Sequence, residues 1–170
     1  MPDILYDRDA LAWSEQQAAL LRRHAAGERV NGIDWDHVVE EIEDVGLSQL
    51  NAVRSYLGLI LLHLLKLHAW PEDTARRHWR DEIVAFQVRA RTRFSPSMRQ
   101  RIDLDALYRD AVRDAARLDY DFPPVRTPPP ACPVTLDPLL SASCQELEAA
   151  FRAAAAAIDS QASDHSDSSH

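Results

Sequence analysis

The sequence contains a single lysine, Lys66, against eighteen arginines. This lysine lies in the most apolar stretch of the chain, residues 56–70. An ammonium group is compact and can lose its proton, whereas a guanidinium group is a rigid fork that stays charged. A lone lysine in an apolar stretch is therefore a candidate for a chemical role.

Glycine, cysteine and β-branched residues are also scarce. Four glycines and few β-branched residues argue against a sheet-rich fold, and the dominant alanine, leucine, arginine and glutamate favour helices. The two cysteines, Cys132 and Cys144, have neither a metal-ligand spacing nor the pattern of a secreted disulfide scaffold. We therefore expect a reducing, cytoplasmic setting.

No long apolar run suggests a membrane protein. A helix needs about 20 apolar residues to span a bilayer, and the run over 56–70 is shorter and contains His63, Lys66 and His68. The N-terminus has no positive region followed by an apolar run, so we expect no signal peptide and no membrane partner. The net charge of −8 argues against a general nucleic-acid binder.

The pattern of apolar residues predicts an all-α fold. Helical spacing indicates helices over about 7–25, 34–45, 48–69, 73–94, 96–118 and 144–158. The 48–69 segment is apolar nearly all round, which places it at the centre of a single bundle of five to six helices. Gly46, which precedes this segment, either breaks or bends the helix expected over 34–45. Gly58 lies inside the segment and suggests that another helix packs closely at that position. We expect a bundle domain over 1–140, an alanine-rich C-terminal helix over 141–158 and a disordered tail over 159–170.

His63 and Lys66 form the first candidate site, because residues three apart are neighbours on one helix face. Packing the 34–45 helix antiparallel to the 48–69 helix would bring Glu41 or Glu43 to them. Such a group could act as base and electrophile or hold an anion. In the structural alternative, the dipole at the C-terminal end of the helix stabilises the positive charge of Lys66. Its aliphatic stem then lets the ammonium group reach water.

A metal site has little support in the sequence. Asp34 and His37 have the acid-x-x-His spacing of helical di-metal proteins, but that site needs a second copy of the motif. No second copy exists, and His37 falls on a polar face. We therefore predict no metal and no cofactor.

Eight arginines lie between residues 76 and 101, against Asp81 and Glu82. Arginine-rich helices bind phosphates. Trp79 and Phe86, however, stand at core spacing and not as stacking platforms. Neutralisation by the acidic 34–44 segment within the bundle is the favoured interpretation, which makes a nucleic-acid partner unlikely.

Several segments in a fixed order resemble a bacterial family, the twenty-ninth in the series of domains of unknown function. The likeness spans about residues 5–140, and the residues that carry it are Tyr6-Asp7, Trp13, Leu20-Leu21-Arg22, Asp34-Trp35, Glu40-Glu41-Ile42-Glu43-Asp44-Val45-Gly46, Leu62-His63-Leu64-Leu65-Lys66, Trp79, Ile83, Ser95-Pro96-Ser97-Met98-Arg99, Tyr108 and Cys132-Pro133-Val134-Thr135-Leu136. The resemblance implies an all-helical fold and no established activity. It joins the acidic and His-Leu-Leu-Lys motifs in one pattern, so Glu40, Glu43, His63 and Lys66 are the candidate site residues.

Three functional hypotheses follow. No glycine-rich phosphate loop, His-Glu-x-x-His or Gly-x-Ser-x-Gly motif is found, which favours a small interaction or regulatory module with a protein partner or a second copy. The alternative is an enzyme, or a small-ligand or anion binder, with a pocket built from Glu40 or Glu43, His63 and Lys66. A weaker alternative is nucleic-acid contact through the helix face over 76–101.

Overall fold

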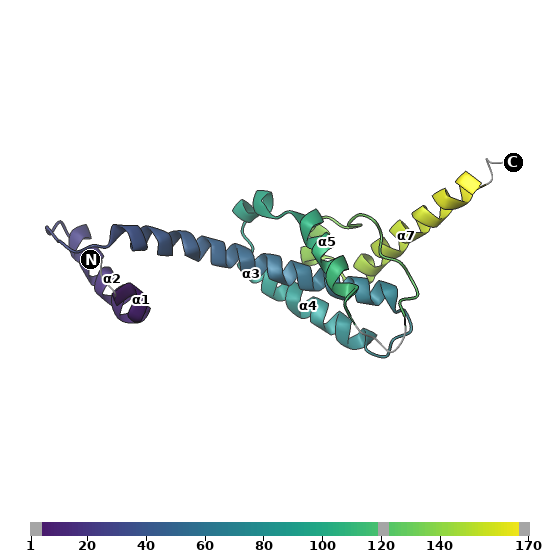
Figure 1. Cartoon of the computed structure of the whole chain (residues 1–170), viewed down its shortest axis with the longest axis horizontal. Coiled ribbons are helices and arrows are strands. Elements are labelled where there is room, and N and C mark those ends of the chain that lie inside the picture. Colours follow the sequence, from purple (N-terminus) through teal and green to yellow (C-terminus); the bar gives the residue numbers. More distant parts are fainter. Residues whose placement is uncertain (1–4, 119–122, 167–170) are drawn as a thin grey trace. The chain divides into compact units, whose positions relative to one another are not determined.

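A computed structural model of the chain describes residues 5–118 and 123–166, and side chains as far as residue 157. The described residues form helices and no strand, which confirms the all-α fold class. Figure 1 shows the elements, which are α1 (Leu5–Arg8), α2 (Ala10–Ala25), α3 (Trp35–Ala69), α4 (Arg76–Arg93), the 3-10 helix η1 (Pro96–Arg101), α5 (Leu104–Ala115), α6 (Leu136–Ser141) and α7 (Cys144–Ser166).

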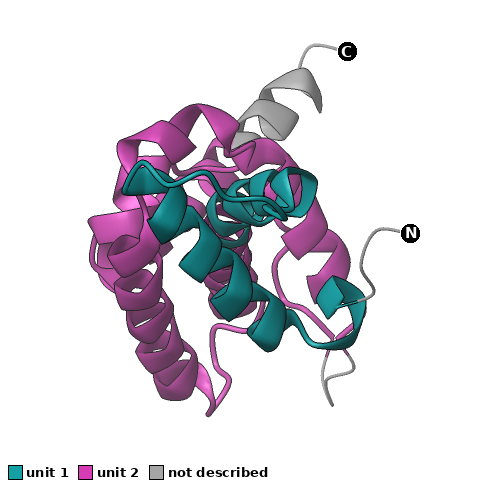
Figure 2. Ribbon diagram, turned by 90° about the vertical axis from the view of Figure 1, so that its left-hand side faces the viewer, with its two compact units in different colours: residues 1–48 teal, residues 49–170 magenta. Residues whose placement is uncertain are grey.

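The chain divides into two compact units, residues 1–48 and residues 49–170 (Figure 2). The expected bundle over 1–140 is thus divided at Ser48, inside α3. Each unit has its own set of buried side chains and is described by itself.

Unit 1 holds α1, α2 and the first part of α3 around a small core. Asp9 separates α1 from α2 because its carboxylate caps α2, accepting from the amide of Ala12 at 3.0 Å. Trp13 and Val38 are buried, and the indole of Trp13 donates to Asp34 at 3.2 Å. Asp34 directly precedes α3, so the helix start expected there is confirmed.

Unit 2 is built on the second part of α3. The apolar positions expected at the bundle centre are buried: Leu50, Val53, Leu57, Ile60, Leu61, Leu64 and Leu67. All of them except Leu50 join one core with residues of four other helices, including Ile83 of α4, Tyr108 of α5, Leu139 of α6 and Phe151 of α7. By length and composition α3 would also pass for a membrane span, a test that the core helix of a globular protein passes as well.

Helix α3 is continuous over 35 residues. Gly46 lies inside it and neither ends it nor has a positive φ. The segments over 34–45 and 48–69 are therefore successive parts of one helix, and the antiparallel pair that we expected from them is wrong. Glycine costs about 1 kcal/mol in a helix, which the good helix formers around it can offset.

The later helices follow the sequence pattern with three differences. The helix expected over 96–118 is split into η1 and α5, because Asp103 caps a new helix by accepting from the amide of Ala106 at 2.9 Å. Helix α6 had no sequence signal. The capping box is present, with the hydroxyl of Ser143 donating to Glu146 at 2.7 Å. Helix α7 continues to Ser166, beyond the expected end at residue 158, and the last part of the expected tail, residues 167–170, lies outside the described residues.

Replacing Gly58 by alanine should raise the free energy of unfolding by about 0.5–1 kcal/mol. The close helix expected at Gly58 is not there, because a Cβ added to it meets no atom within 4 Å. Urea unfolding followed by circular dichroism measures the change. The reverse substitution at an exposed position inside α4, Ala85→Gly, should lower stability by a similar amount. A loss of stability in Gly58→Ala would contradict the open space at this position.

Candidate functional site

His63 of α3 has a carboxylate partner, and this partner is Glu82 of α4. His63 is buried, its Nδ1 lies 2.7 Å from the carbonyl oxygen of Leu59, and its Nε2 lies 2.6 Å from Oε2 of Glu82. A carbonyl oxygen only accepts, so Nδ1 donates to Leu59. The short contact to Glu82 ties α3 to α4 at the edge of the core.

Lys66 lies one turn further along α3 and belongs to the same cluster. Its Nζ is 4.8 Å from the centre of the Trp79 ring, within the range of a cation–π interaction. Burial lowers the pKa of Lys66, while the negative charges of Glu82 and Asp73 act in the opposite direction. The structure thus brings together His63, Lys66 and Glu82.

Glu40 and Glu43 are exposed residues of unit 1. Their neighbour Glu41 accepts a hydrogen bond of 2.7 Å from the hydroxyl of Tyr6, and this bond is the main reason why the pKa of Tyr6 is raised to about 12. A role of Glu40 and Glu43 beside His63 stays a prediction. Sequence reasoning missed Glu82, although its place next to Ile83 and three residues after Trp79 puts it on the flank of the buried stripe.

Three cavities are described in unit 2, and the cluster of His63, Lys66 and Glu82 lines none of them. A reaction needs a place for its substrate within reach of the acid and the base. The observed contacts of the cluster join α3 to α4, and a catalytic role of His63 and Lys66 stays a prediction.

The acid-x-x-His motif also has a local explanation. Nδ1 of His37 donates to Asp34 at 2.7 Å, and its ring stacks on Tyr6 with 4.0 Å between ring centres. The hydrogen bond to Asp34 raises the pKa of His37. Within the described part of the chain, no three His, Cys, Asp or Glu side chains are placed to hold a metal ion.

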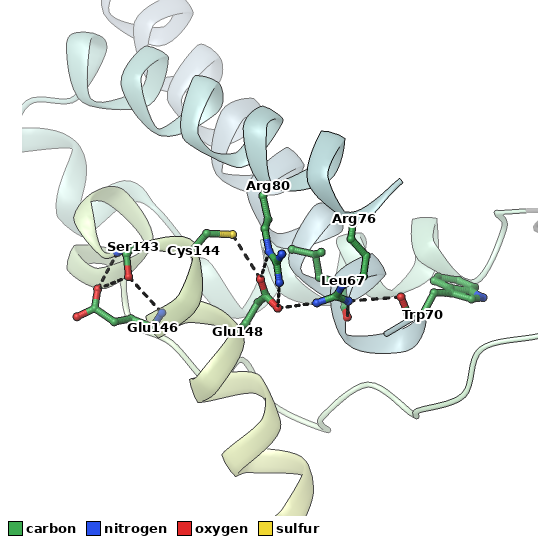
Figure 3. A network of polar contacts seen from close by, with 8 residues as sticks. All are labelled: Leu67, Trp70, Arg76, Arg80, Ser143, Cys144, Glu146 and Glu148. Carbon is green, nitrogen blue, oxygen red and sulfur yellow. Dashed lines mark hydrogen bonds and ion pairs between the residues drawn. The ribbon is translucent and has the colours of Figure 1, made fainter. Parts of the chain in front are cut away.

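The arginines of α4 meet an acid of α7, which is drawn in Figure 3. The buried carboxylate of Glu148 accepts from Arg80 at 2.6 and 3.1 Å and from Arg76 at 2.7 Å. Arg76 also donates to the carbonyl of Leu67 at 2.6 Å, near the end of α3. Neutralisation of these two arginines by the 34–44 segment was therefore a wrong expectation, since Glu148 provides it.

The first part of α3 carries an exposed apolar stripe with acids beside it. Its apolar members, Trp35, Val39, Ile42 and Val45, are 52%, 51%, 68% and 66% exposed. Asp36, Glu40 and Glu43 flank them on one side. We call these seven residues the acidic–apolar face. The spacing of the residues predicts the stripe but not that it is exposed. Of the residues in the predicted stripe, only Val38 is buried.

A second exposed face, on α4, has the opposite charge. Arg77, Val84, Val88 and Arg91 recur at helical spacing, and all four are exposed. No hydrogen bond or ion pair to a described residue engages Arg77 or Arg91. The α4 helix exposes four arginines and one acid, Asp81, to solvent. We call Arg77, Val84, Val88 and Arg91 the arginine–valine face.

Comparison with known proteins places these features in a family. The model of the family described as Domain of unknown function DUF29 matches residues 5–144. The chain belongs to this family. It is also similar to a crystal structure of an alpha-helical protein of unknown function from Rhodospirillum rubrum, with 29% identity and a TM-score of 0.61 over 90% of this chain and 96% of that one. No curated protein matches the chain. The family and this relative support the helical fold, and neither supports a specific activity for this DUF29 protein.

Proposed function

We propose that this DUF29 protein is a helical interaction module that binds a second copy of itself through the acidic–apolar face. One observation carries the proposal: four large apolar side chains in a row on α3 are at least half exposed. Single exposed apolar residues are ordinary, whereas a contiguous patch rimmed by polar residues is typical of an interaction site.

Unit 1 needs such a partner for physical reasons. It spans 48 residues, and Trp13 and Val38 are its only buried large apolar side chains among the described residues. Domains of this size are marginal when they bury so little. Covering the exposed halves of Trp35, Val39, Ile42 and Val45 would contribute about 1 kcal/mol each.

The charge of the acidic–apolar face indicates which surface of the second copy binds to it. Residues 1–48 contain eleven acids and four arginines, a net charge of −7, while the whole chain carries −8. Two acidic–apolar faces would therefore repel each other. The arginine–valine face combines apolar side chains with unpaired guanidinium groups, so it is complementary in both respects.

The proposed contact joins two different faces, and we assign it to a dimer. In a two-fold arrangement each copy offers its acidic–apolar face to the arginine–valine face of the other, which gives two identical contacts. The proposal includes the setting expected from the sequence, which is that of a soluble protein of the bacterial cytoplasm.

Ile42→Glu should weaken this dimer by at least about tenfold, because it places a charge in the middle of the apolar stripe in both contacts. Sedimentation velocity of the full chain at low salt, from about 1 to 100 µM, measures the association. Leu11→Glu is the matched control, since Leu11 is a 70% exposed residue of α2 outside the face. A wild-type protein that stays monomeric over this range, or equal effects of the two variants, would overturn the proposal.

A further inference from the structure

Two adjoining cavities of unit 2 form a site that the proposed function does not use. They have volumes of about 250 and 670 Å³ and share His68, Arg126 and Arg152 in their walls. These residues come from α3, from the proline-rich segment before α6 and from α7. The larger volume is in the range of small-ligand pockets.

Hydrogen bonds hold the proline-rich segment in place beside these cavities. The amide of Val125 donates to the carbonyl of Ala69 at 2.8 Å, and Nε2 of His68 donates to the carbonyl of Thr127 at 3.0 Å. Two residues further, the hydroxyl of Tyr108 donates to Pro129 at 2.7 Å in the core. The wall that carries Arg126 is therefore fixed at three points.

The charges around the cavities are unbalanced in favour of an anion. Glu148 is neutralised by Arg76 and Arg80, and Arg76 lines the smaller cavity. Arg126 and Arg152 are exposed and have no hydrogen bond or ion pair with any described residue. With Glu72 as the other acid in the wall, the charged side chains that line the cavities, three arginines and two glutamates, carry a net charge of +1. Guanidinium groups recognise phosphate oxygens through paired hydrogen bonds.

His68, which lines both cavities, has one unsatisfied acceptor. Because its Nε2 donates to Thr127, the neutral ring keeps a lone pair on Nδ1. This nitrogen is buried and lacks a partner, and in the described part of the chain it is the only side-chain nitrogen or oxygen in that condition. Burial lowers the pKa of His68, and the nearby charge of Arg126 lowers it further against the opposing effect of the Thr127 bond. Buried polar atoms usually have a partner, so this nitrogen can accept one hydrogen bond from a donor that reaches it.

The larger cavity has an apolar side. Its lining includes Val125, Pro128, Pro130 and Ala155. We propose that these cavities bind a small organic phosphate, with its phosphate between Arg126 and Arg152 and its apolar body against the proline-rich segment. None of these residues belongs to either interaction face, so this site and the proposed dimer can fail independently.

Isothermal titration calorimetry of the full chain with phenyl phosphate tests the site. We expect Arg126→Gln and Arg152→Gln each to raise the Kd about tenfold or more, because each loses a charged hydrogen-bond donor to the phosphate. Arg101→Gln, at an exposed arginine of η1 outside both cavities, should leave the Kd unchanged. Thermal unfolding of all three variants checks that they fold, which their exposed side chains favour.

Three results would overturn the assignment. The first is an absence of binding up to about 10 mM phenyl phosphate. The second is an equal change in Kd for Arg101→Gln. The third is inorganic phosphate binding as tightly as phenyl phosphate, since the apolar wall would then contribute nothing to recognition.

Discussion

Glu148→Gln is expected to lower the free energy of unfolding by about 2–3 kcal/mol. The glutamine keeps the shape of the side chain but removes the negative charge that compensates Arg76 and Arg80. Breaking one side of a buried ion pair leaves an uncompensated charge in a poorly hydrated place. The side chain of Arg76 is 18% exposed and that of Arg80 41%, so water screens part of the loss at Arg80.

An exposed pair of the same chemistry is the control for this prediction. Arg113 and Asp110 of α5 are 3.0 Å apart, and both side chains are more than half exposed. Asp110→Asn should change the free energy of unfolding by less than about 0.5–1 kcal/mol. Urea unfolding of both variants under identical conditions gives the comparison. Equal losses would show that the Glu148 pair is as well solvated as a surface pair.

The same pair should give stability a specific pH dependence. Burial by itself would raise the pKa of Glu148, but the hydrogen bond from Arg80 and the charges of Arg80, Arg76 and Arg152 outweigh it, and the net pKa lies below the ordinary value of 4.5. A carboxyl group with a lowered pKa stabilises the fold above its unfolded-state pKa, and this contribution disappears as the pH falls through the folded-state pKa. The stability difference between the wild type and Glu148→Gln should therefore be constant at neutral pH and shrink below about pH 4.5.

Local signals in the sequence were enough to predict much of the fold. The buried face of α3 from Leu50 to Leu67 follows from the spacing of its leucines, because helical periodicity and burial are both properties of one segment. The capping box at Ser143 and Glu146 likewise needs only residues three apart. Helix α6 has a short, proline-containing sequence, Leu136–Ser141, which gives no such periodic signal.

The polar partners could not be predicted in the same way. His63 meets Glu82 across 19 positions, and Glu148 meets Arg80 across 68, so each pairing depends on how whole helices pack. The expected meeting of His63 with the acidic run assumed that Gly46 separates two helices. Glycine disfavours a helix by only about 1 kcal/mol, which tertiary packing and neighbouring residues readily override.

The proposed dimer leads to a second strong prediction. Two variants that each dimerise poorly alone should form a dimer when they are mixed. One variant carries Glu40→Arg and Glu43→Arg in the acidic–apolar face, and the other carries Arg77→Glu and Arg91→Glu in the arginine–valine face. Each variant alone places like charges in both contacts of its dimer. Exposed charge pairs contribute up to about 1 kcal/mol each, so the reversals together should weaken association by roughly a hundredfold or more at low salt.

Mixing the two variants should restore a dimer with one copy of each. One contact then joins the two reversed faces and the other joins the two unchanged faces, so opposite charges meet in both. Sedimentation velocity of the separate and mixed proteins distinguishes the species, and added salt should narrow the difference because it screens exposed charges. If the mixture sediments as the sum of two monomers while the wild type dimerises, the two faces do not meet each other, and the dimer must use another surface.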